Sequence, residues 1–188
     1  MTLILRLLPP VPIESIPLIG ALAVATSIHD YLQIDGRVRW PNDVVVEGSK
    51  VAGLIAEGRQ QGNSQEYVLL GLGINANFES CELQHVDADA TTLKDLNRGP
   101  VDTAKLICNV LLELEELLSL AESDSNQLPE LLRKRDFSIG RSVRVIINDR
   151  PIVGVFADYE SFDAAIVESE GKRMIVPAAS AILVKYPD

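Results

Sequence analysis

This 188-residue chain has few of the residues that build metal centres or disulfide frameworks, with only two cysteines and two histidines. Cys81 lies in a polar stretch, whereas Cys108 lies in a leucine-rich one that we expect to bury it as a small core side chain. Two cysteines placed in this way form neither a disulfide framework nor a metal-ligand motif. The sequence therefore favours a reducing compartment, and we expect a cytoplasmic location.

Positive charge is also scarce, since 17 Lys and Arg residues stand against 27 Asp and Glu, for a net charge of −10. No basic tail or arm interrupts this balance, which argues against broad electrostatic binding to nucleic acid or to anionic membranes. The N-terminal apolar run is short and is broken by Arg6 and by prolines, so it does not resemble a targeting signal. No other apolar run suggests a membrane span. We therefore predict neither a nucleic-acid partner nor a membrane partner.

The order of apolar patterns along the chain predicts two domains. Residues 2–8 read as a strand, and helical spacing of apolar residues predicts helices over about 14–33 and 102–122. From residue 142 onward, five short alternating segments follow one another, at 143–147, 151–159, 164–168, 172–176 and 181–186. So many short strands in about fifty residues are typical of a small β-barrel. We place one domain at residues 1–136 and the barrel at 137–188.

The stretch from Arg39 to Glu57, RWPNDVVVEGSKVAGLIAE, predicts a β-hairpin, because two apolar runs flank a Gly-containing turn. Asn42 and Asp43 stand at the entrance to the first strand, and Lys50 stands at the start of the second. An acceptor pair facing one ammonium on a rigid scaffold indicates a site for an anionic, metal-bound ligand. Taken alone, a lysine beside a turn is more often a solvated charge.

A second pattern follows a polar turn at residues 58–65. Residues 66–74 are nearly all apolar, so we expect a strand that is buried on both faces. It ends in Gly71-Leu72-Gly73-Ile74-Asn75, and glycines within a strand mark a close approach of backbone or ligand. A bulge or tight sheet packing would account for these glycines equally well.

Taken together and in order, three of these segments resemble the motifs of the biotin protein ligases: Trp-Pro-Asn-Asp at 40–43, Lys-Val-Ala-Gly-Leu-Ile-Ala-Glu at 50–57 and Gly-Leu-Gly-Ile-Asn at 71–75. The segment from Gly140 is similar to the start of that family's terminal domain. The resemblance implies an α+β fold, with a mixed β-sheet flanked by helices as in class II aminoacyl-tRNA synthetases and biotin ligases. It also implies that the C-terminal barrel is SH3-like. Lipoate ligases share the catalytic architecture and are the nearest alternative.

The resemblance implies a two-step reaction in which biotin and Mg·ATP give biotinyl-5′-AMP, and a lysine of a biotin carboxyl carrier protein then accepts the biotin. By match to the motifs, Lys50 would bridge the biotin carboxylate and the α-phosphate of ATP, a charge-assisted contact. Asp43 would help to hold Mg²⁺, a hard cation that prefers oxygen ligands.

The remaining motif positions receive binding roles through the same resemblance. Asn42 would orient the site, Trp40 would pack near the nucleotide, and Asn75 would hydrogen-bond the adenine. The backbone at three glycines would approach biotin closely: Gly53, Gly71 and Gly73. Arg39 stands where the family usually has lysine, so the charge is kept but spread over a planar fork.

The chain also departs from the family pattern. The family's catalytic domain begins well before the position of Met1 and carries a loop of the form G-R-G-R-x-G-R, which has no counterpart in this sequence. The resemblance therefore implies an N-terminally truncated member that is incomplete as this chain alone. Three sources of the loop stay open: a separate N-terminal chain, a partner subunit, or a start of the coding sequence upstream of Met1. The alternative is a non-catalytic relative that binds the nucleotide or the carrier. Many relatives in the family form homodimers, so a homodimer is one of the oligomeric states that the resemblance allows.

Overall fold

The computed structural model describes residues 1–6, 11–61, 64–83, 89–147, 150–178 and 181–185. The helices are η1 (Ile13–Ser15), α1 (Ile16–Leu32), η2 (Ser80–Glu82), α2 (Leu93–Leu96), α3 (Thr103–Asp124), η3 (Ser125–Gln127) and α4 (Leu128–Lys134). The strands of the first sheet are β1 (Thr2–Leu5), β2 (Arg37–Arg39), β3 (Asp43–Val46), β4 (Ser49–Gln61) and β5 (Ser64–Ile74). Those of the second are β6 (Ser142–Ile147), β7 (Arg150–Ser161), β8 (Ala164–Ser169), β9 (Lys172–Pro177) and β10 (Ala181–Lys185).

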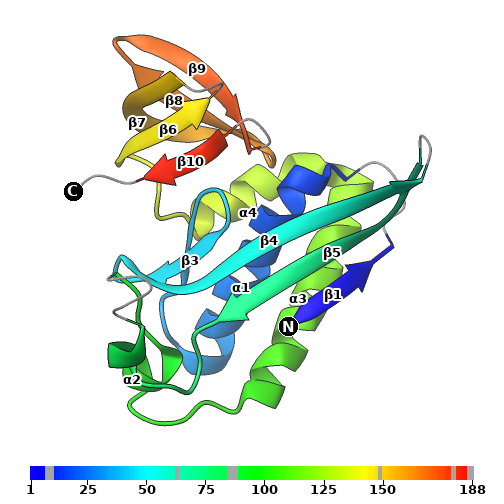
Figure 1. Cartoon of the computed structure of the whole chain (residues 1–188), viewed down its shortest axis with the longest axis vertical. Coiled ribbons are helices and arrows are strands. Elements are labelled where there is room, and N and C mark those ends of the chain that lie inside the picture. The colour runs from blue at the N-terminus through cyan, green and yellow to red at the C-terminus, as the bar shows by residue number, and fades with distance from the viewer. Residues whose placement is uncertain (7–10, 62–63, 84–88, 148–149, 179–180, 186–188) are drawn as a thin grey trace.

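The first sheet runs in the order β1-β5-β4-β3-β2, and every strand pair in it is antiparallel. The α+β class is confirmed, but the expected mixed sheet is wrong for these five strands. Helices α1 and α3 lie behind the sheet and cover one of its faces, while the opposite face is open (Figure 1). This one-sided arrangement determines where a ligand can approach the strands.

Helix α1 is the centre of the larger core. It packs against β4 and β3 on one side and against α3 on the other, and most of its residues are buried. The helix at Ile13–Leu32 is apolar and long enough to pass a test for a membrane span, contrary to the sequence prediction, but 67% of the tested window is buried inside the fold. Its all-round hydrophobicity is that of a core helix. Helix α3 buries one stripe, and Cys108 lies on its exposed side, so the expected burial of this cysteine is wrong.

Strand β5 alternates between the two faces of the sheet. Leu70 and Leu72 are buried against the helices, whereas Gly73 is exposed on the open face. The expectation that this strand is buried on both faces is therefore wrong, because helices cover one face alone. The predicted turn at 58–65 is also wrong in extent, since β4 continues to Gln61 and β5 begins at Ser64. Residues 62–63 lie outside the described part of the chain.

The second sheet confirms the five predicted strands, all paired antiparallel in the order β10-β6-β7-β8-β9. Among the residues that the structure describes, this pairing stops at β10 and β9, so the sheet is not closed and the expected SH3-like barrel is not confirmed. The division of the chain between residues 136 and 137 stays a prediction.

The two sheets meet through an aromatic and polar cluster. Trp40 of the first sheet packs against Phe156 of β7, with ring centroids 5.9 Å apart, and Phe156 contacts Tyr159 edge-on at 5.2 Å. Beneath these rings, the Tyr159 hydroxyl donates to the buried carboxylate of Asp136. Burial raises the pKa of Asp136, although the hydrogen bonds from Tyr159 and from the Ile139 amide oppose that rise.

The raised pKa of Asp136 predicts a specific dependence of stability on pH. The folded protein holds the Asp136 proton more tightly than the unfolded chain, whose aspartates titrate near about 3.9. The contribution of this group to the free energy of unfolding is therefore greatest below that range, and it falls as pH rises through the raised folded pKa of Asp136. Above the folded pKa this contribution is constant.

Urea unfolding at a series of pH values checks this expectation. We expect the difference in the free energy of unfolding, wild type minus Asp136→Asn, to fall as pH rises from the unfolded to the folded pKa of Asp136. Above the folded pKa the difference should level off, because asparagine does not titrate. Profiles that stay parallel over the whole pH range would show that Asp136 has an ordinary pKa.

Candidate active site

The predicted hairpin is confirmed and supplies the charged centre of the site. Strand β3 turns at Glu47 and Gly48, both with positive φ (52° and 88°), and returns as β4. Two positive φ values in a two-residue turn match the twist of the flanking strands, and glycine adopts such a value without strain. The turn therefore fixes which residues of the two strands face one another.

A β-bulge places Lys50 on the open face of the sheet. Asp43 pairs with Gly53 and Val44 with Ala52, but Val45 then pairs with Lys50, so Val51 is the extra residue. Val51 and Ala52 are both buried in the core. Without the extra residue, the two-residue alternation of a strand would turn Lys50 toward the helices.

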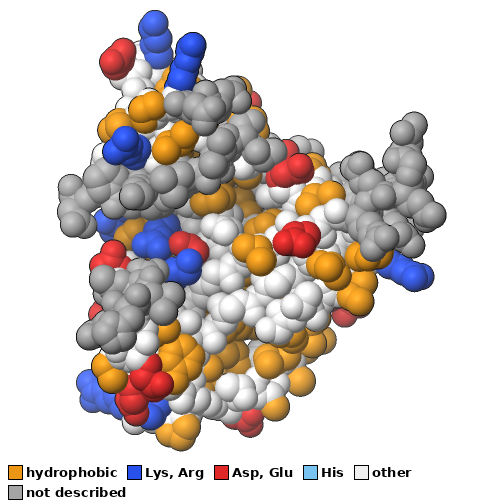
Figure 2. Space-filling model, viewed as in Figure 1, with side chains coloured by type: hydrophobic (Ala, Val, Ile, Leu, Met, Phe, Trp, Pro, Cys, Tyr) orange, Lys and Arg blue, Asp and Glu red, His pale blue; other side chains and the backbone are white. Residues whose placement is uncertain are grey.

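Asp43 lies between two cations on this open face. Its Oδ1 is 2.6 Å from Lys50 Nζ, and its Oδ2 is 2.9 Å from Nη2 of Arg39. The side chain of Lys50 is 30% exposed, and those of Asp43 and Arg39 are each 18% exposed. The three groups carry a net charge of +1, so they hold two cationic donors in fixed positions and favour an anion. Figure 2 shows Lys and Arg side chains gathered beside an acidic one near the left edge of this face.

Asp43 is the carboxylate to which the motif match gives a metal role, and its surroundings can be described directly. Among the described residues, no group of three or more His, Cys, Asp and Glu side chains converges, and each oxygen of Asp43 is already paired with a cation. Magnesium sites use one or two carboxylates together with substrate phosphates and water. In this structure Asp43 places Lys50 and Arg39, and its assignment as a Mg²⁺ ligand stays a prediction.

Two asparagines of the motifs hold the strands in register. The Asn42 side chain donates to the Leu54 carbonyl at 2.7 Å, and the Leu54 amide donates back to the Asn42 carbonyl at 3.0 Å. The side-chain amide of Asn75 donates to the carbonyls of Lys50 (3.3 Å) and Thr91 (3.1 Å). Since both amide hydrogens of Asn75 are used, its side-chain oxygen is the atom that can accept from a ligand.

The segment 89–91 is a part of the site that the sequence did not reveal. The Lys50 amide donates to the Asp89 carbonyl at 2.8 Å, and the Thr91 amide donates to the Lys50 carbonyl at 2.9 Å. These bonds form a short parallel bridge that clamps the backbone of Lys50 from outside the hairpin. Residues 89–91 follow an irregular acidic stretch, so no periodicity marked them.

Trp40 does not lie where the sequence led us to expect. Its side chain is 1% exposed and packs against Phe156, and its backbone amide donates to the Ser138 hydroxyl at 3.0 Å. With so little exposed surface, Trp40 offers no ring face to a nucleotide in this structure. It is instead part of the core between the two sheets, and the peptide bond that joins it to Pro41 is cis.

Gly53 and Gly73 leave a short strip without side chains next to Lys50, and the Ile55 side chain lies over the third glycine of the motifs, Gly71. Gly53 and Gly73 pair across β4 and β5, and Gly71 pairs with Ile55, whose side chain is 62% exposed. A Cβ built on Gly53 would lie 2.9 Å from Lys50 Cε and 3.3 Å from Asp43 Oδ1. A ligand that lies on the backbone at Gly53 would therefore contact the Lys50 side chain directly. Eight motif residues lie on adjacent strands of one sheet or directly next to their ends: Arg39, Asn42, Asp43, Lys50, Gly53, Gly71, Gly73 and Asn75.

Comparison with known proteins points to one family. Residues 3–75 match the family model described as the biotin/lipoate A/B protein ligase family. The recognition made from the motifs is therefore confirmed, on a match that covers less than half of the chain.

Particular relatives narrow the comparison. The chain is 29% identical over 179 residues to the biotin–[acetyl-CoA-carboxylase] ligase of Mycobacterium tuberculosis, an alignment that covers 92% of this chain and 64% of the relative. It is 30% identical over 137 residues to the bifunctional ligase/repressor BirA of Escherichia coli, covering 72% of this chain and 42% of that protein. The chain thus spans between 36% and 64% of the length of the curated relatives that it matches.

Solved structures match the fold across both sheets. The biotin protein ligase of Aquifex aeolicus in complex with biotin and ATP superposes with a TM-score of 0.85 at 21% identity, covering 99% of this chain and 77% of that one. A biotin protein ligase-like protein of unknown function from Silicibacter superposes with a TM-score of 0.70 at 14% identity, covering 94% and 77% of the two chains. At such identities these likenesses establish the fold.

The crowding around Gly53 predicts that an alanine at this position disrupts the charged centre. The added Cβ would lie 2.9 Å from Lys50 Cε and 3.0 Å from its Nζ, so the flexible lysine must leave Asp43. The rate at which an amine-reactive reagent acetylates Lys50, followed by peptide mass spectrometry, should then rise about fivefold, as loss of a modest, partly exposed ion pair allows.

Gly73→Ala is the matched control for Gly53→Ala. Gly73 lies directly opposite Gly53, but a Cβ on it would meet just the Gly53 carbonyl oxygen, at an ordinary 3.5 Å. Labelling of Lys50 should therefore stay at the wild-type rate in this variant. An unchanged rate in Gly53→Ala would mean that the lysine and the added methyl group fit together, contrary to the geometry.

Proposed function

We propose that this chain activates biotin with ATP to form biotinyl-5′-AMP and transfers the biotin to a lysine of a biotin carboxyl carrier protein. The observation that carries this proposal is the fixed pair of cations, Lys50 and Arg39, set by Asp43 beside a strip of glycines. The match of residues 3–75 to the family model supports it, as do relatives whose names describe biotin ligases.

In the first step, an oxygen of the biotin carboxylate attacks the α-phosphorus of ATP, and pyrophosphate leaves. Two anions must approach each other for this bond to form, and a positioned cation lowers the cost of doing so. Lys50 bridges the carboxylate and the α-phosphate, and Arg39 adds a second donor from β2. The product is a mixed anhydride of biotin and AMP. Magnesium, when it accompanies ATP, supplies further charge neutralisation at the phosphates.

In the second step, the ε-amine of the carrier lysine attacks the carbonyl carbon of the anhydride and AMP leaves, so that an amide bond forms. The exposed face of the sheet leaves this carbon open to a partner protein. Biotin lies on the sheet at Gly53, Gly71 and Gly73, where backbone groups are close enough to bond its ureido ring. The side-chain oxygen of Asn75 accepts from the adenine amino group, and Asn42 orients the strand that carries Asp43.

Lys50→Ala tests this assignment. The variant should lose adenylate formation by about 100- to 1000-fold, as expected when a charge-assisted donor to a transition state is removed. Release of pyrophosphate from ATP in the presence of biotin measures the first step, and the mass increment of biotin on an apo carrier domain measures the second. Lys134→Ala is the control, because Lys134 is an exposed lysine paired with Glu130, and its loss changes the net charge equally.

The second candidate is a relative that binds nucleotide or carrier without catalysis, because the same fixed cations would hold a nucleotide whether or not the family's G-R-G-R-x-G-R loop closes over it. If wild-type protein binds ATP but releases no pyrophosphate at saturating biotin, this second candidate replaces the first. A separate chain that supplies such a loop would restore the activity when added. Release of pyrophosphate with lipoate in preference to biotin would instead assign the chain to the lipoate branch.

The finer architectural and cellular assignments belong to this proposal as well. We assign residues 137–188 to an SH3-like barrel of the kind that the family resemblance implies, supported by the five antiparallel strands of the second sheet. A cytoplasmic location, where carrier proteins and ATP are available, and a homodimer complete the proposed description.

A further inference from the structure

The segment that joins the two sheets is bonded to the edge of the first one. The Val38 amide donates to the Arg135 carbonyl at 2.7 Å, and the Phe137 amide donates to the Val38 carbonyl at 2.8 Å. Val38 and Asp136 thus form a parallel bridge beyond β2. We call residues 135–138 the linker strand. It fixes the backbone of β2, the strand that ends at Arg39.

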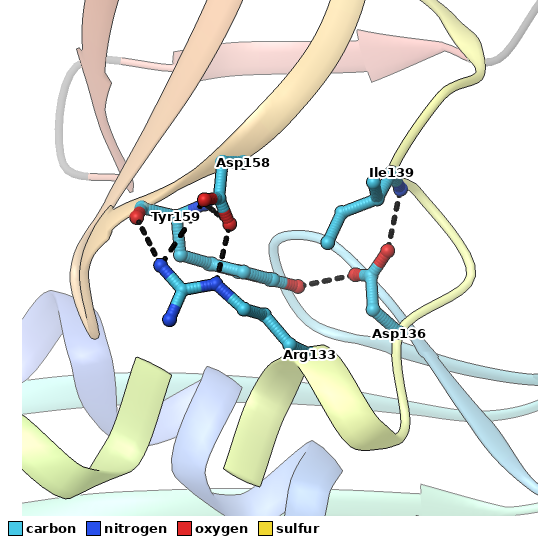
Figure 3. Close-up of polar contacts among 5 residues, drawn as sticks. All are labelled: Arg133, Asp136, Ile139, Asp158 and Tyr159. Carbon is cyan, nitrogen blue, oxygen red and sulfur yellow. Dashed lines mark hydrogen bonds and ion pairs between the residues drawn. The ribbon is translucent and has the colours of Figure 1, made fainter. Parts of the chain in front are cut away.

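The side chain of Asp136 ties the linker strand to the second sheet. One oxygen accepts from the Tyr159 hydroxyl and the other from the Ile139 amide, and Asp136 is 8% exposed (Figure 3). An unpaired carboxylate in so buried a place would be costly, so these bonds hold the linker in one position. Tyr159 belongs to β7 and lies against Phe156, which in turn contacts Trp40.

A second contact in the same region holds the second sheet without touching the linker strand. Arg133 of α4 pairs with both oxygens of Asp158, at 2.6 and 3.2 Å, and donates to the Tyr159 carbonyl at 3.1 Å (Figure 3). Arg133 and Asp136 therefore both bond Tyr159 of β7, Arg133 at its carbonyl and Asp136 at its hydroxyl, and Arg133 also bonds Asp158. Of these two residues, Asp136 alone belongs to the linker strand, which pairs with β2.

We propose that Asp136 is a positioning residue for the candidate active site: held by Tyr159 of the second sheet, it fixes the linker strand against β2 and thereby sets where Arg39 and Asp43 hold Lys50. The path is continuous in bonded contacts. It runs from Tyr159 to Asp136, through the linker strand to Val38, and along β2 to Arg39, which pairs with Asp43. The Ser138 hydroxyl adds a second tie, because it accepts from the amide of Trp40, next to Arg39.

Tyr159→Phe tests the proposal, since phenylalanine keeps the ring packed and removes just the hydroxyl. Acetylation of Lys50 by an amine-reactive reagent, measured by peptide mass spectrometry well below the melting temperature, should rise about fivefold as the ion pair with Asp43 loosens. Asp136→Asn should have a similar effect, because an asparagine oxygen can accept from just one of the two donors in the same geometry. Combining the two substitutions should add little, since both break the same contact.

Arg133→Gln is the matched control. It should lower the melting temperature as Tyr159→Phe does, because it removes the bonds of α4 to Asp158 and to the Tyr159 carbonyl, but it should leave Lys50 labelling at the wild-type rate. Unchanged labelling in Tyr159→Phe and Asp136→Asn would overturn the proposal and leave Asp136 a purely structural group. Equal increases in all three variants would overturn it too, because general loosening of the second sheet would then explain the effect.

The catalytic readout rests on the proposed function and is kept separate from the labelling. In Tyr159→Phe, the kcat for adenylate formation should fall about tenfold with little change in the KM for biotin, because a misplaced lysine acts mainly on the transition state. If wild-type protein forms no adenylate, the proposed function fails while the labelling still decides the role of Asp136. A tenfold rise in KM at constant kcat would contradict the positioning role.

Discussion

The carboxylate of Asp43 lies between the cationic groups of Lys50 and Arg39. Several features of the fold keep these three side chains in contact. The bulge at Val51 turns Lys50 to the open face, the absence of a side chain at Gly53 leaves room for its amine, and segment 89–91 clamps its backbone. Because each cation bonds a different oxygen of the Asp43 carboxylate, the two cations occupy separate, fixed positions. A partly exposed ion pair contributes little to stability, so its value here lies in the fixed placement of two donors where anions meet.

The open face of the first sheet follows from the same arrangement. Helices α1 and α3 cover the other face and provide the buried surface that an antiparallel sheet needs on one side. The face that carries Lys50 is therefore free of core packing, and the backbone at Gly53 and Gly73 lies open on it, beside the exposed Ile55 side chain. A ligand can lie on backbone there without displacing any buried side chain, which separates the requirements of binding from those of stability.

The sequence was sufficient for the features that depend on neighbours along the chain. Two apolar runs around Glu47-Gly48 predict the hairpin, and the hairpin predicts that Lys50 and Asp43 face one another. It was insufficient where distant segments decide. Trp40 is buried because Phe156, more than a hundred residues later, packs on it. The linker strand is defined by its pairing with Val38, which lies far from it in the sequence. The bulge was hidden too, since Val51 is equally apolar in either register.

Arg39 stands where the family usually has lysine, and the geometry of its guanidinium group explains why the contacts of Asp43 are kept. A lysine at this position could neutralise Asp43 through one ammonium, but a guanidinium bonds the carboxylate through one nitrogen and keeps further donors in a fixed plane. Here Nη2 of Arg39 takes Oδ2 of Asp43 while Lys50 takes Oδ1. The remaining N–H groups of Arg39 are then oriented by β2, and β2 is oriented by the linker strand. A residue that reads as a conservative exchange in the motif thus extends the reach of the site toward the second sheet.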